Sequence, residues 1–293
     1  MSRVKYIDRV RGSALTGDEG CPYEQWPARS EEHPFAVHPG GFKVFLPPSQ
    51  LSSSDEYAAA DPYTVVENLA NPFHRRRFET ISRMLNTAVG GQPSPAILDL
   101  GCGEGHMTAE FQKCVPGGEV SGLDYSVSAI AQATARYPGI DFIVADACSP
   151  PYADSYFDVV VCANLWEHVP DPLALLAIIS RISKPGAWLI ISTPSRYRYS
   201  NLIRALLGRP VQLMSGYHVT EYTVGQVSEQ LRFGGFDVRE VSSCPIRAQV
   251  KGHVQWISRR IVERVISSYI RAMGSHHSLE ATVFYLACKG QHQ

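Results

Sequence analysis

The segment from Ala96 to Phe111 constrains the fold more than any other: it reads Ala-Ile-Leu-Asp-Leu-Gly-Cys-Gly-Glu-Gly-His-Met-Thr-Ala-Glu-Phe. It opens with a short apolar run that is typical of a buried parallel strand. Glycines follow on alternate positions, at Gly101, Gly103 and Gly105, and a helical pattern begins at His106. Glycine allows positive φ and close approach of a ligand to the backbone, and a helix start offers unpaired N–H groups. The order of strand, glycine turn and helix therefore predicts a nucleotide-binding cradle.

The spacing of these glycines bears on which nucleotide is bound. A dinucleotide fingerprint has glycine at the first, third and sixth positions, whereas here His106 occupies the sixth and Gly105 the fifth. Asp99 precedes the first glycine by two residues, and a carboxylate there suits a ligand with an ammonium and a sulfonium better than a pyrophosphate. The segment resembles motif I of the class I S-adenosylmethionine-dependent methyltransferases, acidic-x-Gly-x-Gly-x-Gly. A glycine turn without a ligand is the alternative, and the acids downstream disfavour it.

The resemblance implies an α/β fold: a Rossmann-like, seven-stranded, mostly parallel sheet with helices on both faces and an antiparallel last strand. Apolar runs interleaved with helical patterns agree with this order. The Lys184-Pro185-Gly186-Ala187 sequence is interpreted as the turn before the fifth strand. The expected strands begin at Ala96 and span 119–124, 140–146, 157–164, 188–193, 236–241 and 279–288. The expected helices span 62–89 with a break at Asn71-Pro72, a segment from His106, and 129–136, 173–182, 223–233 and 254–272.

Acids that follow the second and third strands support a nucleoside ligand. Asp124 ends the second strand, 25 residues after Asp99, and an acid at that place can accept hydrogen bonds from both ribose hydroxyls. Asp146 follows the third strand, where a carboxylate can accept from the adenine amino group. A turn cap is the alternative role for Asp146. The resemblance implies that S-adenosylmethionine is the cofactor and that it contacts Asp99, Gly101, Cys102, Gly103, Asp124, Tyr125, Asp146, Ala147 and Asn164.

Two histidines are candidates for the general base that an oxygen or nitrogen nucleophile needs. His168 follows the fourth strand, whose end at Asn164 is expected beneath the methyl donor, and His218 lies close to where the acceptor is expected. A purely structural role is the alternative for each. One RNA-methylating branch of the family binds metal through Glu-x-x-Glu-His, but here Asn164 replaces the first carboxylate. A lone Glu167-His168 pair is a weak divalent site, so we expect no metal requirement.

Residues 194–219 form an insertion before the sixth strand, rich in arginine and tyrosine and free of Asp and Glu. Such segments cover the acceptor pocket in the small-molecule branch of the family, and Glu167-His168-Val169 resembles its ubiquinone-pathway and natural-product members. Arginine grips carboxylate or phosphate and tyrosine stacks on rings, so we expect an acceptor with an anionic or aromatic part. The apolar face at 202–207 suits either a packed lid helix or peripheral lipid contact. The candidate acceptor-binding residues are Arg196, Tyr197, Arg198 and Tyr217.

The remainder of the chain is less informative. Residues 1–62 are interpreted as an N-terminal arm that packs on the core or covers the site, and residues 63–293 as the S-adenosylmethionine-binding domain. Arg75-Arg76-Arg77 is either a solvated helix face or an anion contact near the acceptor. Four arginines on the helix expected at 254–272 suit a solvated face, with contact to anionic lipid as the alternative.

Composition limits the function further. The 293 residues carry a net charge of −1, which gives no general attraction to nucleic acid or membrane. Seven cysteines without a C-x-x-C pair, together with the lack of a recognisable signal peptide, favour a reducing, cytoplasmic location. The leading hypothesis is methyl transfer to an oxygen or nitrogen of a small molecule. A nucleic-acid or protein methyltransferase and a non-catalytic S-adenosylmethionine-binding protein are the alternatives, and the sequence leaves the oligomeric state open.

Overall fold

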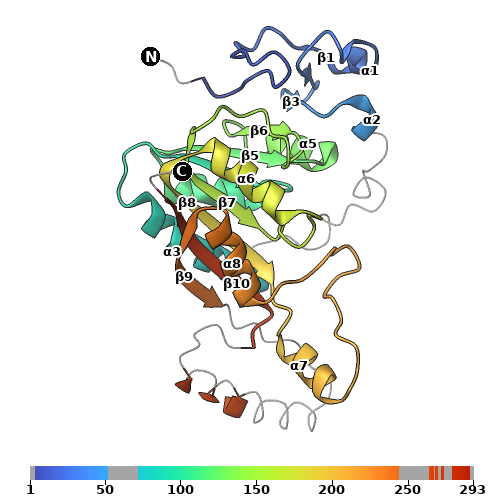
Figure 1. The fold of residues 1–293 in the computed structure, drawn as a ribbon. Coiled ribbons are helices and arrows are strands. Elements are labelled where there is room, and N and C mark those ends of the chain that lie inside the picture. Colours follow the sequence, from blue (N-terminus) through green and yellow to red (C-terminus); the bar gives the residue numbers. More distant parts are fainter. Residues whose placement is uncertain are drawn as a thin grey trace.

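The structure is a computed structural model that describes residues 4–51, 72–243, 264–266, 268–269, 272–273 and 279–290. A twisted sheet runs through it, with helices on both faces and the N-terminal arm at one edge (Figure 1). No helix within these ranges is long and apolar enough to cross a membrane.

All seven expected strands are present. They lie side by side in the order β6-β5-β4-β7-β8-β10-β9, and β10 runs antiparallel to both of its neighbours, as expected. The parallel register pairs Asp99 with Gly122 and Asp124 with Val144, so the carboxyl ends of β4, β5 and β6 meet at one edge. Their bounds are β4 Ala96–Leu100, β5 Glu119–Asp124, β6 Asp141–Val144, β7 Phe157–Ala163, β8 Ser183–Pro194, β9 Phe236–Ser243 and β10 Thr282–Lys289.

The helices divide between the two faces because strand residues alternate in direction. Ile97 points toward the face packed by α3 and α4, whereas Leu98 points toward the face packed by α6 and α8. Helix α5 packs on the first of these faces through Ile130 and Ala133, which meet Phe142 of β6. The bounds are α3 Pro72–Val89, α4 His106–Cys114, α5 Val127–Arg136, α6 Pro172–Ile182, α7 Tyr199–Leu206 and α8 Val224–Phe233.

Side chains fix where several helices begin. Ser126 rather than Ser128 caps α5, by accepting a hydrogen bond from the Ala129 N–H. Asp171 caps α6 directly before Pro172, the favoured place for proline. Thr223 and Gln226 form a reciprocal capping box at the start of α8. These local signals explain why the expected helices begin within two residues of the observed ones.

The N-terminal arm packs on the core and extends the sheet, so one sheet of ten strands results. The arm strands are only two residues long, and β3 joins the edge of β6. Lys5 ties the arm down through ion pairs to Glu119 at 2.9 Å and Asp141 at 2.6 Å. The arm elements are β1 Cys21–Pro22, a 3₁₀ turn at Tyr23–Gln25, α1 Trp26–Arg29, β2 Ala36–Val37, β3 Lys43–Val44 and α2 Pro48–Leu51.

One expected element is contradicted by the structure, and others fall outside the described residues. The Lys184-Pro185-Gly186-Ala187 segment is not a turn before the fifth strand, because α6 runs directly into β8 and these residues belong to it. The pairing of β7 with β8 is irregular between Phe157 and Val159, and Gly186 accommodates the distortion with φ +75°. The helices expected at 62–71 and over most of 254–272 lie outside the described residues.

Candidate active site

The glycine turn after β4 forms an open backbone cradle. Gly101, Gly103 and Gly105 adopt φ of +79°, +53° and +73°, which L side chains rarely adopt. A Cβ on Gly105 would lie 2.6 Å from the Phe142 ring, so this position also needs glycine for space. Helix α4 starts at His106 without a side-chain cap at Gly105, which leaves its first N–H groups available to a ligand.

Two of the predicted acids lie buried beside this turn. Asp124 accepts hydrogen bonds from the Gly103 N–H at 2.8 Å and the Ser126 N–H at 2.9 Å, so one carboxylate joins the turn to the end of β5. Asp99 is buried and accepts from the Thr108 hydroxyl at 2.7 Å. These contacts orient both carboxylates at the ends of β4 and β5.

The other predicted cofactor residues surround the same strand ends. Asp146 accepts from the Cys148 N–H at 2.8 Å, which is the turn-cap role considered above, and this bond uses only one of its oxygens. Cys102 points into the core beside Phe142, so the turn offers a ligand only its backbone here. Tyr125 donates to the Gln50 carbonyl of the arm at 3.3 Å. The neighbouring Ala147 is half-buried in the loop after β6.

Asn164 ends β7 in a left-handed conformation, with φ +57°. Its N–H donates to the Ser192 carbonyl and its side-chain oxygen accepts from the Ser192 hydroxyl, both at 2.8 Å. Two bonds to β8 therefore hold the turn that carries the chain into residues 165–169.

The predicted histidines lie together after this turn. The rings of His168 and His218 are 5.0 Å apart, edge to face. His168 Nδ1 donates to the Tyr217 carbonyl at 3.2 Å, and His218 Nδ1 donates to Glu221 at 3.0 Å. Burial, together with the charge of His218, lowers the pKa of His168.

Glu167 lies next to the two histidines. It is fully buried, and its backbone carbonyl accepts from the N–H groups of Val219 and Thr220 at 2.9 and 3.3 Å. Its side chain accepts from the Thr193 hydroxyl at 3.1 Å. Burial raises the pKa of Glu167 to about 7. The insertion that carries His218 is thus fastened directly to the loop after β7.

One predicted acceptor residue of the insertion has another role. Arg198 is buried and bonds to Glu221, to the Gln212 carbonyl and to the Ser195 carbonyl. It therefore stabilises the conformation of the insertion, and its guanidinium is not positioned to bind an acceptor. The side chains of Arg196, Tyr197 and Tyr217 are exposed.

The sequence interpretation missed Glu221 as a functional candidate, and it left Arg77 with two possible roles as part of the arginine triplet. Glu221 lies just past the acid-free segment and is fully buried between Arg198 and His218. Arg77 is buried on α3, and its positive charge opposes the raised pKa of Glu167. The helical spacing could have indicated that Arg77 is buried, because it lies four residues before the core residue Ile81 and therefore on the same face of the helix. Within the arginine triplet only Arg75 is fully solvent-facing.

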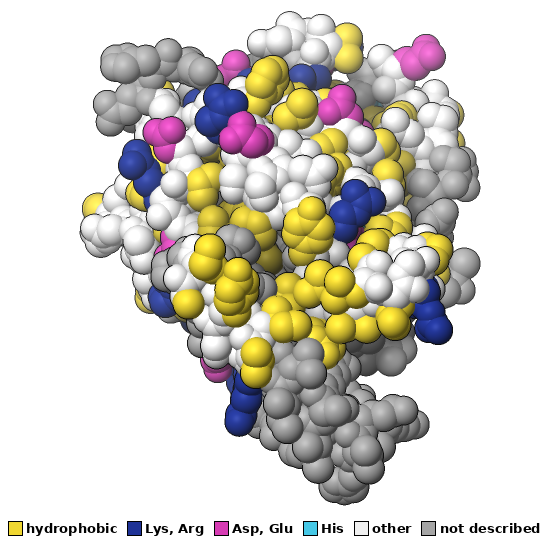
Figure 2. Space-filling view, turned by 60° about the horizontal axis from the view of Figure 1, so that its bottom comes forward, with side chains coloured by type: hydrophobic (Ala, Val, Ile, Leu, Met, Phe, Trp, Pro, Cys, Tyr) yellow, Lys and Arg dark blue, Asp and Glu magenta, His cyan; other side chains and the backbone are white. Residues whose placement is uncertain are grey.

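Helix α7 and the chain after it carry apolar side chains to the surface. Leu206 and Leu207, on the face expected to pack as a lid helix, are 71% and 63% exposed. Figure 2 looks onto this end of the molecule and shows hydrophobic side chains in broad patches on its surface.

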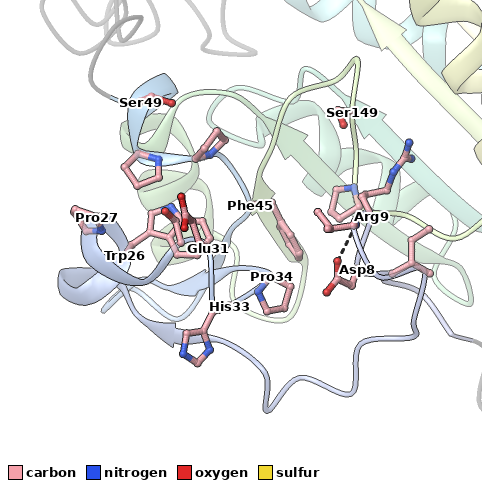
Figure 3. Close-up of a pocket in the computed structure, with 16 residues that line it drawn as sticks. Asp8, Arg9, Trp26, Pro27, Glu31, His33, Pro34, Phe45, Ser49 and Ser149 are labelled. Atoms are coloured by element: carbon pink, nitrogen blue, oxygen red, sulfur yellow. Dashed lines mark hydrogen bonds between the residues drawn. The ribbon is translucent and has the colours of Figure 1, made fainter.

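A separate open pocket lies between the arm and residues 149–151 (Figure 3). Its volume is about 520 Å³, and Trp26, His33 and Phe45 of the arm form part of its wall. None of the predicted cofactor, catalytic or acceptor residues lines it, so it is distinct from the strand-end site.

Comparison with known proteins gives a consistent result. A family model described as a methyltransferase domain matches residues 73–241. A probable S-adenosylmethionine-dependent methyltransferase of Mycolicibacterium smegmatis is 30% identical over 168 residues, 56% of this chain and 60% of that protein. A ubiquinone biosynthesis O-methyltransferase of Thiobacillus denitrificans is 38% identical over 114 residues, 36% of this chain and 47% of that protein. The matches thus span about half to three fifths of these relatives.

A solved structure shares the fold. The magnesium protoporphyrin IX methyltransferase of Synechocystis PCC 6803, determined with bound SAH, superposes with a TM-score of 0.53. The match covers 77% of this chain and 89% of that one. Because the sequence identity is only 14%, this similarity supports the fold and nothing further.

Proposed function

Because the chain belongs to the class I S-adenosylmethionine-dependent methyltransferases, we propose that it methylates an oxygen or nitrogen of a small molecule with an anionic or aromatic part. The family establishes the enzyme class and S-adenosylmethionine as the cofactor. The acceptor, its reacting atom and the residue roles below are our proposals.

Two features of the strand-end site support this cofactor. The three glycines give the turn a positive-φ conformation, and the first N–H groups of α4 have no side-chain cap at Gly105. We assign Asp124 to the ribose hydroxyls, Asp146 and the Ala147 N–H to the adenine, and Asp99 to the cationic end. S-adenosylmethionine, when bound, supplies a methyl group activated by the sulfonium.

The observation that carries the acceptor assignment is the attachment of residues 217–221 to the loop after β7. The N–H groups of Val219 and Thr220 bond to the Glu167 carbonyl, so the insertion lies against the loop that follows the expected methyl position. Its exposed arginine and tyrosines, Arg196, Tyr197 and Tyr217, then border the acceptor and bind its anionic or aromatic part.

The proton of the acceptor nucleophile leaves toward His168 and His218. We expect His218→Ala to lower kcat by roughly 10²- to 10⁴-fold, the usual range for loss of a general base. Affinity for S-adenosylmethionine stays within a few-fold, because the glycine turn and strand-end acids are untouched. Radiolabelled methyl transfer to an acceptor found by screening gives kcat, and calorimetry gives the affinity.

His38→Ala is the matched control for that experiment, because His38 lies on the arm and stacks on Phe42. It should leave both quantities unchanged. Full turnover by His218→Ala on the true acceptor would show that His218 has no part in the proton transfer.

Charge reversal at Arg196 tests the assignment of an anionic group on the acceptor. Arg196→Glu should raise KM for the acceptor by about tenfold, which corresponds to about 1.4 kcal/mol of binding free energy, because the variant replaces an attractive charge with a repulsive one. Arg209→Glu makes the same change of charge at another exposed position of the insertion. Equal KM values for the two variants would refute the proposed role of Arg196 in binding the acceptor.

A further inference from the structure

We propose that Glu167, His168 and His218 form a binding site for one divalent transition-metal ion of the Zn²⁺ class. One carboxylate oxygen and one nitrogen of each imidazole lie within 4.8 Å of one another. The sequence presented Glu167-His168 as a lone pair with Asn164 in place of another carboxylate. Folding adds His218, some 50 residues away, as the third ligand.

The hydrogen bonds of both imidazoles are those that metal ligands need. His168 Nδ1–H donates to the Tyr217 carbonyl, and His218 Nδ1–H donates to the Glu221 carboxylate. Each bond fixes the neutral tautomer in which Nε2 keeps its lone pair. A metal-bound histidine commonly donates its other ring N–H to a carbonyl or carboxylate in this way.

Glu167 supplies an independent observation. Its Oε2 accepts from Thr193, whereas Oε1 is buried and has no hydrogen-bond partner among the described residues. A buried acceptor without a partner is costly, on the order of 1–3 kcal/mol. A metal ion between this carboxylate and the two imidazoles would remove that cost.

The ligand set selects the class of ion. Ca²⁺ and Mg²⁺ prefer oxygen ligands, whereas imidazole suits Zn²⁺ and its first-row neighbours. Two imidazoles and one carboxylate also match catalytic zinc sites, which keep a fourth position open. His218 comes from the insertion and the other two ligands from the loop after β7, so the ion would clamp the insertion over the site.

A coordination position left open on the ion would give the ion a role in the reaction. This role depends on the proposed function, whereas metal binding itself does not. An acceptor hydroxyl bound there would lose its proton to solvent at lower pH, because a divalent ion stabilises the oxyanion. The acceptor oxygen then forms its bond to the methyl carbon as the bond from that carbon to sulfur breaks. With the ion bound, the two histidines would hold it and would not take the proton, so the general-base role proposed above would apply only to the metal-free enzyme.

Metal binding can be measured without any acceptor. The full chain, without a histidine tag, is treated with a chelator, desalted and titrated with Co²⁺ followed by visible absorption, while Zn²⁺ is counted by mass spectrometry. We expect about one equivalent of either ion. His168→Ala and His218→Ala should each weaken binding by at least 10- to 100-fold, and His38→Ala should bind as the wild type does. The His218 side chain is only 9% exposed, so circular dichroism checks that each variant keeps the fold.

Two results would overturn the proposal. The first is a wild-type protein that takes up no more cobalt than the His168→Ala/His218→Ala double variant. The second is cobalt bound with the intense thiolate absorption of a cysteine site that the double variant retains. Calorimetry of the metal-free protein with S-adenosylmethionine separates this failure from failure of the proposed function. Turnover that chelation leaves unchanged would refute the role of the ion in the reaction.

Discussion

Asp124→Ala is expected to weaken binding of S-adenosylmethionine by about 100-fold or more. The carboxylate is assigned to both ribose hydroxyls, and a hydrogen bond to a charged group contributes about 1.5–3 kcal/mol. The same side chain holds the Gly103 and Ser126 N–H groups, so its loss also loosens the glycine turn. Two lost bonds of at least 1.4 kcal/mol each give the expected factor. Isothermal calorimetry with the cofactor and with its demethylated product measures it.

Two further variants make this result interpretable. Asp124→Asn keeps an oxygen that can accept one of the backbone bonds, so we expect intermediate affinity and near-normal thermal stability. Asp237→Asn removes an exposed acid on β9 and should change nothing. Wild-type affinity in a folded Asp124→Ala protein would refute the assigned ribose contact.

Glu221→Ala should abolish turnover while the cofactor still binds. Glu221 is fully buried and bonds to Arg198, to His218 at 3.0 Å and to the Met214 N–H at 2.5 Å. Its removal leaves the Arg198 guanidinium buried without its counter-charge, and breaking a buried pair in this way costs about 3–5 kcal/mol. We expect the insertion to open locally and His218 to lose its orientation, so that kcat falls by at least 100-fold. Hydrogen exchange over residues 194–223 reports the opening.

A compensating pair of substitutions tests the electrostatic part of this argument. Replacing both partners with apolar residues, Arg198→Met with Glu221→Leu, leaves no buried charge and should restore much of the thermal stability. It cannot restore the hydrogen bond to His218, so turnover stays low. Glu229→Gln breaks an exposed, solvent-screened pair with Arg232 and should leave thermal stability and turnover unchanged. Normal turnover in Glu221→Ala would contradict the structural role of the Arg198–Glu221–His218 cluster.

The sheet and the glycine turn after β4 could be predicted because their signals are local. The apolar run at Ala96, the alternate glycines and the helix start at His106 all lie within one strand-turn-helix unit, and the observed β4 and α4 begin at the expected residues. The short arm strands could not be predicted, since two residues carry no alternation and pairing with β6 depends on a partner about 100 residues away. The Lys184-Pro185-Gly186 sequence likewise resembled a turn, but it forms the irregular stretch of β8 between Ser183 and Trp188, which pair with Phe157 and Val159 of β7.

By itself, the sequence determined the fold class and the cofactor, and it led to the strand ends that we propose bind the cofactor, because short-range patterns of apolar residues, glycines and acids indicate each of these. Only the tertiary structure decided what the insertion does. It paired Arg198 with Glu221, buried Arg77 beside the site, and brought His218 to Glu167 and His168. Burial and charge pairing between distant segments depend on how the chain closes in space, and no local pattern in the sequence encodes that closure.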